Sequence, residues 1–194
     1  MKLQLVSAPA SEPITVSDLK THLRIDAATE DSYLPALIAA ARETVEQRAW
    51  RALFTQTWDL TLDRWPSGRS IKLPKPPLQS VTYVKYTDED GVQSTLSSDA
   101  YVVDTAGEPG RIVLKIDQSW PSATLQVTSA IVVRFVCGWA STGSIPPALV
   151  HAVRILAGHY YENREATMFA AGVSAIVMPF GVDALVQMHS AREF

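Results

Sequence analysis

The stretch that decides the fold is IVVRFVCGWASTGSIPPALVHAVRILAGHYYEN, residues 131–163, because its hydrophobic period changes half-way along. Ile131–Val136 is mostly apolar and β-branched, with Arg134 as its one charge, which is typical of a strand. Pro146 and Pro147 then open a segment of helical spacing that runs to about Asn163, since Pro is tolerated in a first helical turn. The buried stripe of this helix is expected to consist of Leu149, Ala152, Val153, Leu156 and Tyr160. A β block therefore ends, and a helical block begins, between residues 139 and 145.

A short helix is predicted near the N-terminus. Thr15 can cap it while Asp18 answers from the third helical position, and Ile14 can pack on Leu19 as a hydrophobic staple. The helix should end near Arg24.

A longer helix is predicted from about Ser32 to Arg51. Ser32 is preferred as its cap because Pro35 then falls in the first turn, where the missing N–H costs little. The expected buried face comprises Leu34, Leu37, Ile38, Ala41 and Val45. The expected solvated side comprises Arg42, Glu43, Glu46 and Arg48.

The middle of the chain reads as short strands separated by turns. The predicted strands are Thr57–Asp63, Ser80–Thr87, Val92–Leu96, Tyr101–Asp104 and Arg111–Leu114. Asp88–Gly91 and Gly107–Gly110 are expected to be turns, and Pro74, Pro76 and Pro77 favour a sheet edge or a crossover. A short terminal helix is predicted over Val182–His189.

This order predicts the α+β class, in which N-terminal and C-terminal helices form a small bundle around a central block of short antiparallel strands. We expect one domain over residues 1–194, helical over about 14–53, antiparallel β over 54–139 and helical again over 145–194.

Composition excludes several classes of protein. The chain has 194 residues, 47% of them apolar, and a net charge of −3, so general nucleic-acid binding has no electrostatic support. The N-terminus is too weakly apolar for a signal peptide. The uncharged run Ala166–Val182 is shorter than the roughly 20 apolar residues that a membrane span needs.

No group of residues points to catalysis or to a bound metal. His159 and Glu162 share a helix face, but a di-iron site needs the order Glu-x-x-His twice, and no second copy exists. The single cysteine, Cys137, is best interpreted as a buried thiol. Asp88–Gly91 lacks the frame of a calcium loop, and Gly107–Arg111 lacks that of a phosphate loop. We therefore expect no enzyme activity, no cofactor and no metal.

Nine segments follow one another in an order that resembles the head–tail connector, or adaptor, proteins of tailed phages and prophages. They are ITVSDLKTHLRI (14–25), LFTQTWDL (53–60), LPKPPLQSVTYVKY (73–86), GEPGRI (107–112), SWP (119–121), VRFVCGW (133–139), IPPAL (145–149), HYYENRE (159–165) and PFGVDAL (179–185). The set covers nearly the whole chain.

The resemblance implies a structural protein of the virion that assembles in the host cytoplasm and occupies the head–tail junction. Related proteins form a ring of about a dozen copies under the portal, bridge the head to the next connector or tail protein, and let DNA pass without specific binding. No membrane is involved. In related adaptors the C-terminal segment docks on the portal. The residues expected to bind a partner are Tyr161, Glu162, Arg164, Phe180, Val182, Leu185 and Val186.

Two other hypotheses stay open at this point. One is a small hydrolase or metal enzyme, which a bound metal would support. The other is a monomeric binding module or a different non-enzymatic virion protein, which would keep its partners without the C-terminal segment.

Overall fold

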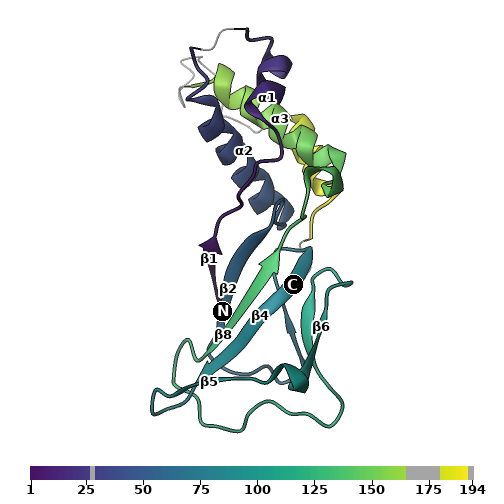
Figure 1. Ribbon diagram of the computed structural model, residues 1–194. Coiled ribbons are helices and arrows are strands. Elements are labelled where there is room, and N and C mark those ends of the chain that lie inside the picture. Colours follow the sequence, from purple (N-terminus) through teal and green to yellow (C-terminus); the bar gives the residue numbers. More distant parts are fainter. Residues whose placement is uncertain (27–28, 165–179, 192–194) are drawn as a thin grey trace, which may run out of the picture.

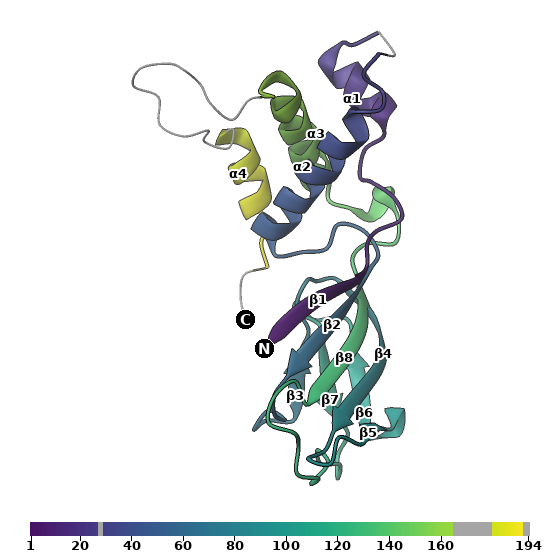
Figure 2. The same cartoon turned by 90° about the vertical axis from the view of Figure 1, so that its left-hand side faces the viewer.

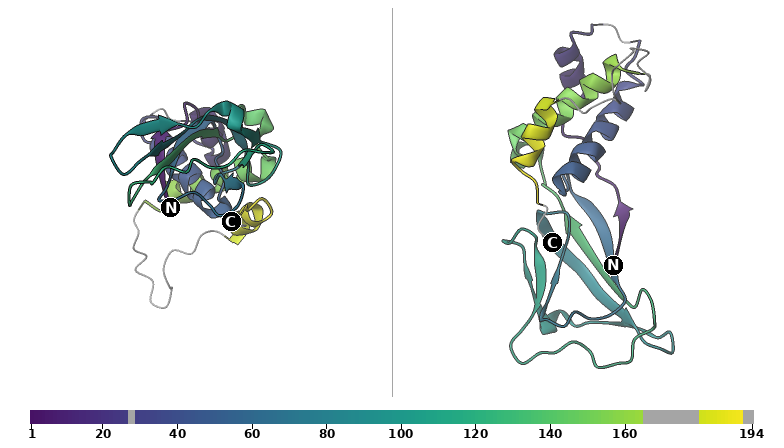
Figure 3. Two further views of the ribbon diagram at one scale, coloured as in Figure 1. Left: turned by 90° about the horizontal axis from the view of Figure 1, so that it is seen from below. Right: turned by 180° about the vertical axis from the view of Figure 1, so that it is seen from behind.

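The computed structural model describes residues 1–26, 29–164 and 180–191, and it shows an elongated molecule with helices at one end and strands at the other (Figures 1 and 3). The helices are α1 (Val16–Leu23), α2 (Leu34–Ala49), α3 (Pro147–Glu162) and α4 (Phe180–Gln187). The strands are β1 (Lys2–Ser7), β2 (Gln56–Leu62), β3 (Ser70–Lys72), β4 (Leu78–Thr87), β5 (Gln93–Thr95), β6 (Tyr101–Asp104), β7 (Arg111–Leu114) and β8 (Ile131–Cys137). Two short 3₁₀ helices lie at Ser98–Ala100 and Thr142–Ser144.

The strands form two antiparallel sheets. The larger sheet has five strands in the order β1-β2-β8-β4-β5, and the smaller one has three in the order β3-β7-β6. β8 is the central strand of the larger sheet, paired with β2 on one side and β4 on the other. Its alternating burial follows from this position, because one face of the strand packs on the core. The predicted α+β class is confirmed.

Each end of the molecule has its own apolar core. The helices share a cluster that includes Leu19, Leu34, Val45, Leu156 and Val186. A second cluster fills the space between the two sheets, and its largest fully buried side chain is Phe135. The predicted stripe of α3 lies in the helical cluster, with Tyr160 partly buried at its margin.

The start of α1 is as predicted. The Thr15 hydroxyl accepts a bond from the Asp18 backbone N–H at 3.1 Å, and the Asp18 carboxylate accepts one from the Thr15 N–H at 2.9 Å. Ile14 and Leu19 are both buried in the helical cluster, and Arg24 ends the helix in the left-handed conformation.

The start of α2 differs from the prediction. The N-cap is Tyr33, which makes no side-chain capping bond, and Ser32 lies outside the helix. A turn precedes the helix instead, because the backbone N–H groups of Tyr33 and Leu34 both donate to the Glu30 carbonyl. Pro35 does fall in the first turn, where no N–H is needed.

Two strands were not predicted. β1 forms only because Lys2–Ser7 pairs with β2 at one edge of the larger sheet (Figure 2). β3 is three residues long and pairs with β7. The Pro-rich segment after β3 leads from the smaller sheet to the larger one, as the crossover interpretation expected.

Candidate assembly interface

The predicted partner-binding residues at the end of α3 meet the turn before α2. Tyr161 donates its hydroxyl to one carboxylate oxygen of Glu30, and Arg164 donates to the other at 2.5 Å. The Arg164 guanidinium also lies 4.8 Å from the Tyr161 ring centroid and 5.2 Å from that of Tyr33. Glu162 is exposed and forms no side-chain bond to Glu30, Tyr161 or Arg164, so it takes no part in this contact. The end of α3 is thus tied to α2 within the chain, and Glu162 is left open to a partner.

The electrostatics of this contact follow from its hydrogen bonds. The bond from Tyr161, and then that from Arg164, lowers the pKa of the Glu30 carboxyl below its ordinary value of 4.5. The same bond raises the pKa of Tyr161, because loss of the phenolic proton would place two negative charges together.

The predicted residues of α4 are divided between core and surface. Val182 and Val186 are buried in the helical cluster, and Leu185 is partly buried against it. The side chain of Phe180 lies outside the described residues, as does most of the uncharged run. α4 packs on both α2 and α3, and Arg48 pairs with Asp183 at 3.0 Å.

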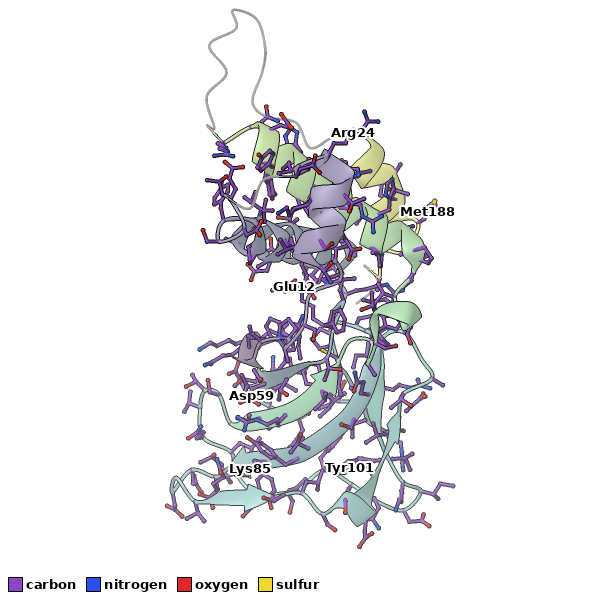
Figure 4. The ribbon with its side chains drawn as sticks, turned by 45° about the horizontal axis from the view of Figure 1, so that its top comes forward. Glu12, Arg24, Asp59, Lys85, Tyr101 and Met188 are labelled. Atoms are coloured by element: carbon purple, nitrogen blue, oxygen red, sulfur yellow. The ribbon has the colours of Figure 1, made fainter. Side chains whose placement is uncertain are left out.

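The outer side of α4 presents a different set of residues. Gly181, Ala184, Gln187 and Met188 are exposed, and the Met188 side chain points away from the helices (Figure 4). Met188 is 70% exposed, so it is available to a partner. A partner that meets α4 in this conformation would contact these residues rather than Val182 or Val186.

The tail after α4 is held at the junction between helices and strands, a contact that the sequence did not indicate. Arg51 donates through Nε to the His189 carbonyl oxygen and through its two Nη atoms to the Glu108 carboxylate, at 2.8 and 2.5 Å. The Ala191 N–H donates to the Ala49 carbonyl at 2.9 Å. One arginine thus joins the end of α2, the tail and the turn between β6 and β7.

A buried polar network at the same junction corrects the expected solvated side of α2. Arg42 and Glu46 are buried and are bonded to each other at 2.9 Å. Glu46 also accepts bonds from the Leu53 N–H at 2.7 Å and the Gln56 side-chain amide at 2.6 Å. Arg42 reaches Glu12, which lies between the helices and the sheets (Figure 4), at 2.8 Å.

The reason for this correction is that the network closes the region where α2 passes into β2. Burial raises the pKa of the Glu46 carboxyl, and its hydrogen bonds from Leu53 and Arg42 oppose that rise. Glu43 and Arg48, which also belong to the expected solvated side, are exposed as predicted, although each forms an ion pair.

The described residues contain neither a reactive thiol nor a cluster of metal ligands. Cys137 is fully buried, and burial raises the pKa of its thiol to about 12, so this thiol is not a nucleophile at neutral pH. Within residues 1–26, 29–164 and 180–191, no three His, Cys, Asp or Glu side chains gather as metal ligands would. No helix in the same ranges is long and apolar enough to cross a bilayer.

Comparison with known proteins identifies the class of this chain. The model of the head completion protein family matches residues 12–179, so the chain belongs to that family. No curated protein matches it.

Several solved structures that resemble this chain belong to gene transfer agent (GTA) particles. The chain is similar to a protein in the neck of an empty GTA particle computed with C6 symmetry, with a TM-score of 0.80 and 28% identity over 100% of this chain and 97% of the other. It is also similar to one in the neck of the native GTA particle computed with C12 symmetry, with a TM-score of 0.78 and 26% identity over the same shares. A chain of the virion of the native gene transfer agent gives the same values.

Proposed function

We propose that this protein is a structural head–tail adaptor that sits at the head–tail junction of a phage-like particle. The observation that carries the proposal is the similarity, over nearly the full length of both chains, to proteins in the necks of solved particles. Family membership supports it independently. In this role the protein is a non-enzymatic building block, and residues 1–194 act as one connector domain in which α1, α2, α3 and α4 share one apolar core.

The neck of the similar particle was computed with twelve-fold symmetry, which supports a ring of this chain with about a dozen copies. A ring contact is heterologous, because one face of each copy meets a different face of the next. The elongated shape, with helices at one end and sheets at the other, allows the two ends to meet different neighbours (Figure 1).

The outer side of α4, together with the exposed Glu162 at the free end of α3, forms the proposed partner surface toward the portal (Figure 2). Val182, Val186 and Leu185 fix α4 on the helical core, while Glu162 and Met188 are open to solvent. The sheet end would then face the downstream connector or tail protein. DNA would pass without specific binding, because a chain with net charge −3 makes few phosphate contacts.

The test uses cells that produce the complete particle and a chain with an affinity tag. Intact necks would be purified, the proteins in them identified by mass, and the tag located by electron microscopy. The proposal expects the tag in a ring at the head–tail junction, and expects heads without tails when the chain is absent. A chain that copurifies with no particle protein, or that remains monomeric in complete particles, would reject it.

A matched pair of variants tests the α4 surface. Met188→Asp should fold normally but recover less portal-sized protein, because Met188 is exposed. Ala184→Ser, on the same outer side, is the control and should recover the normal amount. Equal recovery by both variants would place the portal contact elsewhere.

A further inference from the structure

The larger sheet has two open edges. β1 lies at one end of the strand order and pairs only with β2. At the other end, β5 pairs with β4 only from Lys85 to Thr87, with one more bond from the Leu96 N–H to the Val84 carbonyl. Among the described residues, β8 is therefore the only strand paired with the first half of β4, Leu78–Tyr83.

The edge at β1 is only partly protected against pairing, by Lys2 at its start and by a register shift between Leu5 and Ser7. Natural edge strands carry charges or prolines that keep other strands away. Between Gln4 and Ser7, β1 has neither, and Leu5 and Val6 are each 43% exposed although both are apolar. Such a strand gains stability when another strand covers it.

In this half of β4, Leu78 is buried against Gly110, and the exposed residues follow it. Gln79, Ser80 and Thr82 are exposed, and none carries a charge. Register shifts occur in this half of β4 and between Leu5 and Ser7 in β1. Such irregularities bend and twist a strand locally, which suits sheets that must follow a ring.

Residues that lie opposite one another on successive strands form a row across the sheet, and the two edges share the same rows. Leu5 is opposite Trp58, which is opposite Phe135, which is opposite Val81. In the next row the pairings connect Ser7 with Ser80 in the same way. The open half of β4 and the second half of β1 (Gln4–Ser7) therefore lie at the same position along the strand direction.

The strand directions match as well. Every pairing from β1 through β2 and β8 to β4 is antiparallel, so β1 and β4 run in opposite directions. In a rotationally symmetric ring every copy has the same orientation along the axis. When β1 of one copy reaches β4 of the next, the two strands therefore meet in the antiparallel sense, and their backbone groups can pair.

From these observations we infer that the ring is joined by sheet extension, with β1 of one copy adding to the open edge formed by Leu78–Tyr83 in β4 of the next copy. The inference rests on the proposed ring and names the surfaces that form it. The occupant is a second copy of this chain, since a copy brings an apolar edge strand of matching position and direction.

Disulfide cross-linking in purified necks tests the contact directly. Strands in one sheet lie about 5 Å apart, within the reach of a disulfide. Ser7→Cys would be combined in turn with Ser80→Cys and with Thr82→Cys, which allows for a shift of register. The native Cys137 is buried and stays out of the reaction. Oxidation should give covalent multimers up to the size of the ring with at least one of the two pairs.

The control combines Ser7→Cys with Gln93→Cys. Gln93 is exposed on β5, but it is opposite Thr87, outside the rows that β1 occupies. This pair should give no multimers. Rings that form normally but cross-link with neither test pair would overturn the inference and leave the adaptor role intact. Cross-links from Ser7→Cys to a different neck protein would overturn it too. If no ring forms even with the unaltered chain, both proposals fail.

A second pair of variants compares two sheet edges. Val6→Lys places a charge on the β1 edge and should abolish ring incorporation while the melting temperature of the isolated chain stays unchanged. Val102→Lys makes the same change on β6, an edge of the smaller sheet where the valine is similarly exposed, and should leave incorporation intact. Normal incorporation of Val6→Lys, or equal loss with both variants, would contradict the inference.

Discussion

Glu46 lies in α2 and Glu30 in the turn before it, and the two carboxylates have the same kinds of partner, yet their surroundings differ. Each carboxylate is bonded to one arginine and to at least one other donor. Glu46 lies at the junction with the sheets, and its side chain and that of Arg42 are 8% and 6% exposed. Glu30 lies at the free end, where its side chain and that of Arg164 are 32% and 47% exposed.

From this difference we expect burial, more than the number of bonds, to decide what a polar contact contributes to stability. The pKa of Glu46 is raised because burial dominates, and the pKa of Glu30 is lowered because its hydrogen bonds dominate. A buried ion whose partner is removed cannot return to water, whereas an exposed one can. The junction should therefore be sensitive to mutation and the free end tolerant.

The largest effect is expected for Glu46→Ala. The change removes the acceptor of one Arg42 Nη atom, of the Leu53 N–H and of the Gln56 amide in a buried region, and it leaves Arg42 with Glu12 and Glu43 as partners. Removing one partner of a buried ion pair costs about 3–5 kcal/mol. Chemical denaturation of the isolated chain, followed by circular dichroism, would measure the loss of free energy of unfolding.

Glu43→Ala is the matched control, since Glu43 is exposed and one turn away, and contacts Arg42 only at 3.5 Å. The free energy of unfolding of Glu43→Ala should equal that of the unaltered chain within the measurement error. Equal losses of unfolding free energy in Glu46→Ala and Glu43→Ala would show that burial does not set the contribution of the network to stability. That result would contradict the comparison.

Much of the fold could be predicted because its signals are local. The capping box at Thr15 and Asp18 involves residues three apart, and the alternation over β8 is contained in seven residues. β1 could not be predicted in this way, since KLQLVS becomes a strand only by pairing with β2, more than fifty residues later. The cap at Ser32 was wrong because a turn on the Glu30 carbonyl starts α2 without any side-chain cap.

In the candidate site, too, the local features could be predicted and the contacts between distant residues could not. HYYENRE was predicted to end a helix near a surface, and α3 does end at Glu162. Its contact with Glu30 joins residues more than 130 apart, and no local pattern indicates such a pair. The Arg42–Glu46 pair did carry a signal, since it is an i, i+4 pair on the margin of the buried stripe, next to Ala41 and Val45.

The Arg51–Glu108 pair is intermediate in burial between the contacts of Glu46 and Glu30. The Arg51 side chain is 11% exposed, and its partner Glu108 is 47% exposed. Arg51→Met keeps the aliphatic stem but removes the bonds to Glu108 and to the His189 carbonyl. Because Glu108 can return to water, we expect a loss of about 1–2 kcal/mol, less than a fully buried charged bond contributes.

Limited proteolysis would show where the Arg51→Met loss occurs. The tail after α4 should be cut faster than in the unaltered chain, because its contact at the junction is weakened. Arg48→Met, which removes the exposed pair with Asp183, is the control and should have a smaller effect on unfolding. A loss with Arg51→Met that exceeds the loss with Glu46→Ala would reverse the proposed order.

The smallest effect is expected for Glu30→Gln, and its dependence on pH identifies its origin. Because the folded state lowers the pKa of Glu30, the carboxylate stabilises the fold above the ordinary value of 4.5, and this contribution disappears as the pH falls below it. Glu30→Gln should therefore melt slightly below the unaltered chain at pH 7, and the two melting curves should converge on acidification. Tyr161→Phe removes one of the two donors and should give a smaller difference with the same pH trend. A difference in melting temperature that persists at acid pH would show that Glu30 acts through packing rather than charge. The contrast with Glu46 would then have no electrostatic basis.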